Sequence, residues 1–279
     1  MNIDPHDDPH DHDRGLAFDL STLLNRRRAL TMLAAAGLAT LAGCGSDSGG
    51  PPAASTATST STSTSTGSGS ATCQEIPQET AGPYPGDGTN GPNVLTQSGI
   101  VRSDIRSSFG SASGTAEGAP LTINLTVVDQ ANGCAAREGA AVYLWHCNQD
   151  GLYSLYGQGI TDQNYLRGVQ AAGSDGRVTF KSIFPAAYSG RWPHIHFEVY
   201  PNLSAATSAS SLITTSQLAL PEDACKLVYA TDGYGQSVTN LAQTSLDSDN
   251  VFGDGSAQQL AKVTGSVAAG FTAELTVPV

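Results

Sequence analysis

Positive charge is scarce in this chain, and several common functional signatures are missing from it. Its 279 residues hold 13 Lys and Arg against 25 Asp and Glu, a formal net charge of −12 at pH 7. An acidic surface argues against binding to nucleic acid or to anionic membranes. The part expected to fold has no Gly-rich phosphate loop and no Gly-x-Ser-x-Gly motif. A nucleotide-binding loop and a serine-hydrolase nucleophile elbow therefore have no support.

A hydrophobic run long enough to span a membrane is not found near the N-terminus either. Residues 29–41 are apolar but far shorter than the roughly 20 residues that a spanning helix needs. They follow Arg26, Arg27 and Arg28 and end in Leu-Ala-Gly before Cys44. Paired arginines, a short apolar region and small residues are typical of a twin-arginine export signal, predicted here over residues 1–43.

The end of this signal resembles the lipobox of bacterial lipoproteins. That resemblance implies cleavage before Cys44 and a lipid on its sulfur, which would be the only membrane contact. An ordinary cleaved signal with an incidental cysteine is the alternative. Residues 44–72 are rich in Ser, Thr and Gly and bury too little apolar surface to fold, so a disordered tether is predicted. The folded domain is predicted over residues 73–279, exported and held at the cell surface or extracellular.

Cysteine is also scarce, and no Cys-x-x-Cys pair occurs, which argues against a thiolate zinc site. Once Cys44 carries a lipid, four cysteines remain. In an oxidising compartment an even number predicts disulfides, so we expect no free thiol among them. Three pairings are open for these disulfide candidates, which are Cys73, Cys134, Cys147 and Cys225.

Helical signals are few, whereas strand-like runs are frequent. The first run alternates Leu121, Ile123 and Leu125 with polar residues, as a strand with one buried face does. Strands are predicted at 121–129, 139–147, 176–184, 194–200, 212–220 and 270–279, and short helices at 221–229 and 236–245. Many strands, Gly-rich turns and little helix indicate an all-β fold, an antiparallel β-sandwich with long loops.

His194 and His196 stand one residue apart in the run HIHFEVY. Side chains two residues apart in a strand project to the same face, so both imidazoles can meet one metal ion. A pair of surface histidines is the alternative. Only His146 remains elsewhere in residues 73–279, so further ligands must be carboxylate, tyrosine or cysteine. Tyr153 and Tyr188 lie at predicted turns that flank strands.

Four motifs occur in order: QETAGPYP, WHCNQDGLYS, FPAAYSGRWPHIHF and TTSQLAL. Together they resemble the intradiol ring-cleavage dioxygenases, the family of catechol and protocatechuate dioxygenases. The resemblance spans residues 78 to about 220 and the last strand. It implies a β-sandwich, in agreement with the strand pattern. It also implies a Fe(3+)-dependent enzyme of aromatic compound catabolism that uses O2 to cleave catechol-type rings between the hydroxylated carbons, giving muconate-type diacids.

The resemblance also implies a set of ferric ligands, namely Tyr153, Tyr188, His194 and His196. Phenolate oxygens suit this hard, highly charged ion. By motif order, Tyr188 is the tyrosinate that leaves the iron when substrate binds and helps to carry off a proton. It is therefore counted among the catalytic residues as well.

Arg191 matches a family arginine near the ring carbon under attack, where a guanidinium stabilises developing charge. Gln217 matches a family glutamine beside that arginine. Ordinary surface or packing use is the alternative for both. The segment that lines the substrate mouth in the family corresponds here to Thr80, Gly82 and Tyr84, for which a rigid Gly-Pro turn is the alternative.

Two other functions remain open at this stage. Tyrosine and histidine also suit iron capture, so an exported lipoprotein that binds ferric iron or a siderophore is one of them. A catalytically inactive β-sandwich adhesion module is the other. Arg191 and Gln217 favour the enzyme because iron capture does not require them. The expected partners are a small aromatic diol and O2, and the protein is expected to be a monomer or a homodimer.

Overall fold

The computed structural model describes residues 73–279, in which nine β-strands form two sheets. The five-stranded sheet holds β1 (Pro120–Asp129), β2 (Ala135–Ala136), β5 (Arg177–Ile183), β8 (Lys262–Ser266) and β9 (Gly270–Pro278). The four-stranded sheet has the order β4 (Arg167–Ala171), β3 (Ala141–Trp145), β6 (His194–Tyr200) and β7 (Thr214–Ala219). The predicted signal (1–43), the tether (44–72) and the lipidation of Cys44 lie outside the described residues.

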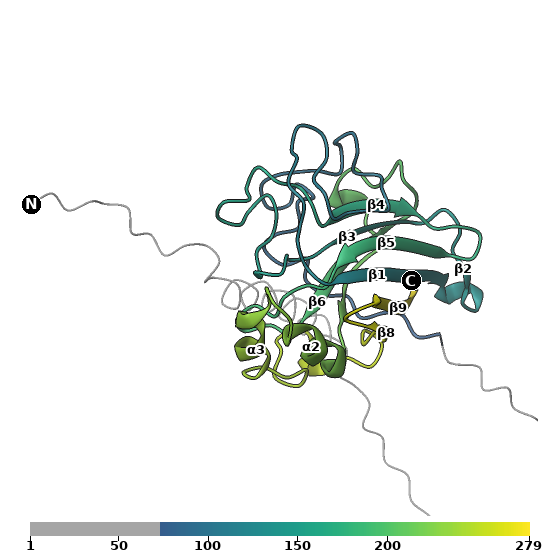
Figure 1. Ribbon diagram of the computed structural model, residues 1–279. Helices are drawn as coiled ribbons and strands as arrows, with labels where there is room; N and C mark the ends of the chain where they lie inside the picture. The colour runs from purple at the N-terminus through teal and green to yellow at the C-terminus, as the bar shows by residue number, and fades with distance from the viewer. Residues whose placement is uncertain (1–72) are drawn as a thin grey trace, which may run out of the picture. The chain divides into compact units, whose positions relative to one another are not determined.

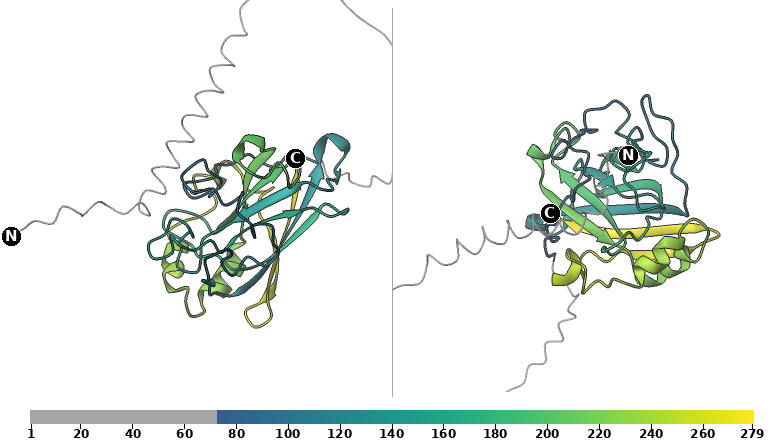
Figure 2. Two further views of the ribbon diagram at one scale, coloured as in Figure 1. Left: turned by 90° about the horizontal axis from the view of Figure 1, so that it is seen from above. Right: turned by 90° about the vertical axis from the view of Figure 1, so that its left-hand side faces the viewer.

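This arrangement confirms the predicted all-β sandwich with long loops. Two short helices, α2 (Glu222–Tyr229) and α3 (Gly235–Leu241), lie side by side at one end of the sheets (Figure 1, Figure 2). All six predicted strands are present, whereas β2, β4 and β8 escape the sequence patterns. One detail of the prediction is wrong, since β1 and β9 pair in parallel and the sandwich is not wholly antiparallel. Within residues 73–279, no helix is both long and apolar enough to cross a bilayer.

The two sheets enclose a hydrophobic core built by strand alternation. From β1 the core receives Leu121, Ile123, Leu125 and Val127, while the polar residues between them stay half-buried. From β6 it receives Ile195, Phe197 and Val199. Complete burial of a side chain of this size contributes about 1.5–3 kcal/mol, so this shared core fixes where β6 lies.

The opposite face of β6 carries the two histidines. The alternation that sends Ile195 and Phe197 into the core sends His194 and His196 to the other face of the four-stranded sheet. On that face a second hydrophobic cluster forms beneath the long loops, and it includes Trp145 and Tyr153. The histidines therefore lie on the outer side of the sheet, and the loops that cover them supply Tyr153 and Tyr188.

Only one disulfide forms among the described cysteines, between Cys73 and Cys134. Cys147 and Cys225 are free and buried, so the prediction that all four pair is wrong for these two. Tertiary placement explains the difference, because Cys147 lies in the cluster beneath the loops and Cys225 lies on α2 in the core between the sheets. Burial raises the pKa of the Cys147 thiol to about 12, which keeps it protonated and unreactive.

Removal of the disulfide is expected to destabilise the fold. The bridge joins residues separated by 61 positions, so replacing Cys73 and Cys134 with serine should lower the free energy of unfolding by about 2–4 kcal/mol. Denaturant unfolding measures the loss, and a reductant should bring the parent to the stability of the double variant. In a Cys44→Ser background, denatured protein should titrate two thiols before reduction and four afterwards. Four thiols before reduction would contradict the bridge.

Candidate functional site

Three of the predicted side chains converge on Nε2 of the fourth, His194. The Tyr153 hydroxyl lies 3.4 Å from this nitrogen, the Tyr188 hydroxyl 3.2 Å and His196 Nε2 3.1 Å. The histidines come from β6, Tyr153 from the loop between β3 and β4, and Tyr188 from the loop between β5 and β6. The fold thus brings the whole predicted ligand set together from three separate segments. These four side chains are called the ligand cluster below.

Both histidines are held in fixed orientations. Nδ1–H of His194 donates to Trp192 O at 2.5 Å, so the lone pair of Nε2 faces the ligand cluster. His196 stacks on Trp145, with ring centroids 4.9 Å apart and planes 6° from parallel. Burial lowers the pKa of both imidazoles well below the usual value, and the positive charge of Arg191 lowers it further. Both rings are therefore neutral, which is the form that binds a metal.

The two tyrosines are positioned where their loops meet. Gly151 has a φ of +81°, and a Cβ at this position would lie 3.0 Å from Tyr188 Cβ, so the contact requires glycine. Burial, together with the neighbouring Tyr188, raises the pKa of the Tyr153 phenol well above its ordinary value. Tyr156 is close in sequence but donates its hydroxyl to Asn90 O at 2.8 Å, outside the ligand cluster.

The ligand cluster suits a ferric ion in its chemistry. Within residues 73–279, no group of three or more His, Cys, Asp and Glu side chains could hold a metal. Tyr153 and Tyr188 are therefore needed to complete a four-donor set with the two imidazoles. Phenolates suit a hard, highly charged cation, and such a cation favours ionisation of phenols that burial otherwise keeps protonated.

Arg191 and Gln217 are in contact beside the ligand cluster. Gln217 is the cross-strand partner of His196 on β7, and its Oε1 accepts a hydrogen bond from Arg191 Nη2 at 2.7 Å. Gln217 Nε2 in turn donates to Thr80 O at 2.9 Å. Both side chains are buried. The two hydrogen bonds connect the predicted catalytic residues Arg191 and Gln217 to the mouth segment at Thr80.

Sequence reasoning missed the anion that accompanies Arg191. Nε of Arg191 donates to Asp249 Oδ2 at 3.0 Å, and both side chains are almost completely buried. Asp249 stands in the run LDSDN, which matches no motif. The sequence holds only an indirect signal for this residue, because a buried arginine needs a buried anionic partner somewhere in the chain.

The predicted mouth segment runs against His196. Gly82 has a φ of +70°, and a Cβ there would lie 3.3 Å from His196 Cε1, so the backbone approaches the ring closely. Gly82 N donates to Thr80 Oγ1 at 3.0 Å, and the Tyr84 ring lies 5.1 Å from that of Tyr153. Thr80, Gly82 and Tyr84 thus all lie at the edge of the site.

A second buried arginine that the sequence patterns missed fixes this segment to the sheet. Arg167 on β4 donates to Tyr84 O at 2.9 Å, to Pro85 O at 2.7 Å and to the Tyr143 hydroxyl at 2.9 Å. It also donates to Ser154 O at 2.9 Å. One guanidinium therefore connects the mouth segment and the loop that carries Tyr153.

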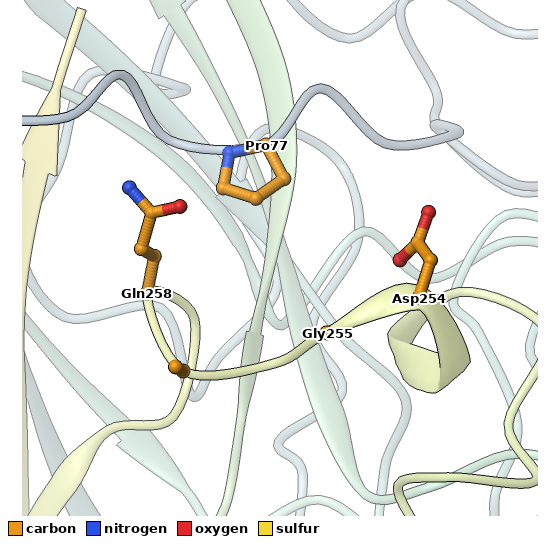
Figure 3. A pocket seen from close by; sticks show the side chains of 5 residues that line it. Pro77, Asp254, Gly255 and Gln258 are labelled. Atoms are coloured by element: carbon orange, nitrogen blue, oxygen red, sulfur yellow. The ribbon is translucent and has the colours of Figure 1, made fainter.

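A pocket of about 270 Å³ lies at Pro77, and its wall does not include any predicted site residue. Figure 3 shows Asp254 and Gln258 on either side of this proline. Glu79, two residues further on, is buried and accepts a hydrogen bond from Gln259 Nε2 at 3.3 Å. Burial, and secondly repulsion by Asp254, raises the pKa of Glu79 to about 7.

This raised pKa should make stability depend on pH. The folded protein keeps a proton on Glu79 between pH 4.5 and about 7, where the unfolded chain releases it. The contribution of this group to stability is therefore present at low pH and is lost as the pH rises through that window. Glu79→Gln should be more stable than the parent by about 1–3 kcal/mol at pH 8 and equal to it at pH 4. The exposed Glu75→Gln serves as control, and a constant difference between Glu79→Gln and the parent at both pH values would contradict the assignment.

The chain matches a protein-family model. The Dioxygenase_C model, described as Dioxygenase, matches residues 90–233. Among curated proteins, chlorocatechol 1,2-dioxygenase from Rhodococcus opacus is 40% identical over 50 residues. That match covers 18% of this chain and spans only 20% of the relative's length.

Two solved structures share the fold. An intradiol ring-cleavage dioxygenase from Tetranychus urticae has a TM-score of 0.59 at 23% sequence identity, over 74% of this chain and 94% of that chain. A second dioxygenase crystal structure has a TM-score of 0.58 at 22% identity, with the same coverage of 74% and 94%. At these identities the similarity establishes the β-sandwich.

Proposed function

The chain belongs to the intradiol ring-cleavage dioxygenase family, and on this premise we propose that it is a ferric-iron-dependent enzyme that cleaves catechol-type aromatic rings between the two hydroxylated carbons. The observation that carries the proposal is the ligand cluster, with Arg191 and Gln217 in contact beside it. All six of these residues fall within the segment that matches the family, residues 90–233.

Each residue has a defined task in the proposed reaction. Tyr153, Tyr188, His194 and His196 hold the iron, which when bound supplies a Lewis acid that draws electron density from a catechol. Tyr188 is less buried than Tyr153, and as the phenolate it would accept a substrate proton at its oxygen. The guanidinium of Arg191 stabilises negative charge that develops on the ring as it reacts with O2.

The remaining residues position the substrate. Gln217 holds Arg191 on one side and the mouth segment on the other, while Thr80, Gly82 and Tyr84 border the ring. The bond between the hydroxylated carbons breaks, and both atoms of O2 enter the product as parts of two carboxyl groups. The atoms and electrons balance without a separate reductant, and the product is a muconate-type diacid.

The two other functions are less well supported. Capture of iron or of a siderophore needs the ligand cluster but has no use for a buried arginine held by Gln217 beside it. An inactive adhesion module has no need for two tyrosines and two histidines that converge on one point.

Oxygen consumption tests the proposal. The whole chain, loaded with iron, should be wine-red from charge transfer between tyrosinate and Fe(3+). It should consume one O2 per catechol cleaved and form a diacid heavier than the substrate by the mass of O2. A coloured protein that consumes no O2 with any of a panel of catechols would favour iron capture. A colourless protein with one equivalent of zinc would remove the ligand assignment itself.

We also propose that the enzyme works outside the cytoplasm, anchored by a lipid on Cys44. The support is the sequence of residues 26–44, with paired arginines, a short apolar run and a lipobox-like end. Cys44→Ala should release the domain into the medium or leave the signal uncleaved. Cell fractionation with mass determination distinguishes these results, and a processed variant that stays with the membranes would contradict the anchor.

A further inference from the structure

The guanidinium of Arg191 is hydrogen-bonded on two sides to buried side chains. Gln217 accepts from its Nη2 at 2.7 Å. Asp249 accepts from Nε at 3.0 Å through Oδ2, and from Nη2 at 3.4 Å through Oδ1. A carboxylate that meets a guanidinium with both oxygens fixes the plane of the guanidinium as well as its position.

Asp249 is itself held rigidly by the backbone. Its Oδ2 accepts from Trp192 N at 2.7 Å, and its Oδ1 accepts from Val251 N at 2.9 Å and Phe252 N at 3.2 Å. Backbone donors therefore orient both oxygens of a carboxylate that is only 2% exposed. Such a carboxylate holds Arg191 in one position, unlike a surface carboxylate whose side chain is free to rotate.

The bond to Trp192 N gives Asp249 a second connection to the site. Trp192 follows Arg191 directly and precedes His194 by two residues, and Trp192 O accepts from His194 Nδ1. One carboxylate thus fixes the start of the segment that carries both the arginine and the first histidine. Asp249 lies beyond residue 233, where the family match ends, so the anchor comes from a part of the chain outside that match.

We propose that Asp249 is a positioning residue for ring cleavage: it holds the guanidinium of Arg191 where charge develops on the substrate. This inference rests on the proposed dioxygenase function and deepens it. Electrostatic stabilisation depends on a charge that is already oriented before the reaction, because reorientation during the reaction costs free energy. Asp249 supplies this orientation, and Gln217 completes it from the other side.

Asp249→Asn in the whole, iron-loaded chain tests the proposal. Asparagine keeps the shape of the side chain but removes the charge and one acceptor. Iron content, charge-transfer absorption and KM for catechol should stay near the parental values, while kcat falls by about 10–100-fold, a usual cost of losing a partner that orients a site residue. Asp247→Asn is the matched control, because Asp247 is exposed two residues away and its loss should leave kcat unchanged.

A double variant separates positioning from a merely structural role. If Asp249 acts through Arg191, then Asp249→Asn should lower kcat by no more than about twofold in an Arg191→Ala background. An equal loss of kcat in both backgrounds would overturn the proposal. So would parental kcat in Asp249→Asn with iron bound.

Should Asp249→Asn fail to fold, Arg191→Lys tests the same idea from the other side. Lysine keeps the charge but cannot meet both Asp249 oxygens and Gln217 with one planar group. A loss of kcat of tenfold or more supports positioning, and kcat within twofold of the parent overturns it. Absence of O2 uptake by the iron-loaded parent would overturn the dioxygenase function, and with it this inference. Uptake by the parent together with unchanged variants overturns the inference alone.

Discussion

His196→Ala is expected to remove the iron, the red colour and the activity together. His196 Nε2 lies 3.1 Å from His194 Nε2 and is one of only four donors in the ligand cluster. Alanine leaves three donors and a gap beside Trp145, on which the ring stacks. Loss of a direct ligand should cost more than the roughly 10–100-fold in metal affinity that losing an outer partner costs. Iron content per protein after gel filtration, visible absorption and oxygen uptake measure the three effects.

His146→Asn is the matched control for this variant. His146 is the remaining histidine of residues 73–279 besides His194 and His196, and it is as buried as they are. Its ring nitrogens, however, contact Ser182 Oγ at 2.6 Å and Cys147 O at 2.7 Å rather than the ligand cluster. This variant should lose some stability but keep its iron and colour. Equal iron contents in the His196 variant and the parent would exclude His196 as a ligand.

Arg191→Ala should have the opposite profile: iron, colour and catechol binding stay, while turnover falls by about 10²–10³, as expected when one preoriented charge stabiliser is lost. The substitution also leaves Asp249 buried without its cation. Removing one member of a buried ion pair costs about 3–5 kcal/mol of stability. Turnover should therefore be measured at low temperature and expressed per bound iron, so that partial unfolding does not mimic a catalytic defect.

Arg177→Ala controls for the loss of an arginine as such. Arg177 pairs with Glu274 at 2.7 Å, and both side chains are about two-fifths exposed. Exposed pairs of this kind contribute at most about 1 kcal/mol, so stability and turnover should hardly change. Parental turnover in the iron-loaded Arg191 variant would remove this residue from the mechanism.

The features predicted from sequence are those that local spacing determines. The alternation in β1 and the His-x-His spacing in β6 follow from the two-residue period of a strand, which does not depend on distant residues. The convergence of Tyr153 and Tyr188 on His194 came from the family resemblance, because no local rule places two loops on one strand.

The features that could not be predicted from the sequence depend on long-range contacts. β4 (Arg167–Ala171) begins with Arg and Gly and shows no clear alternation, yet it pairs along β3, and its Gly168 is needed because a Cβ would lie 2.5 Å from Ile105 Cγ2. The parallel pairing of β1 with β9 joins the first strand of the domain to the last. The Asp249–Arg191 ion pair and the Cys73–Cys134 disulfide likewise join segments that are far apart in the sequence, and no periodic pattern in the sequence predicts these contacts.

The Cys73–Cys134 bond also determines how the domain carries mechanical load. Tension applied to the chain ahead of Cys73 passes through the disulfide to Cys134, because that is the shorter covalent path. Residues 74–133 lie inside the closed loop, so the covalent path of the tension bypasses them while the bond is intact. This loop contains Thr80, Gly82 and Tyr84. In a domain pulled by its N-terminal end, this covalent path therefore does not run through the segment at the edge of the candidate site.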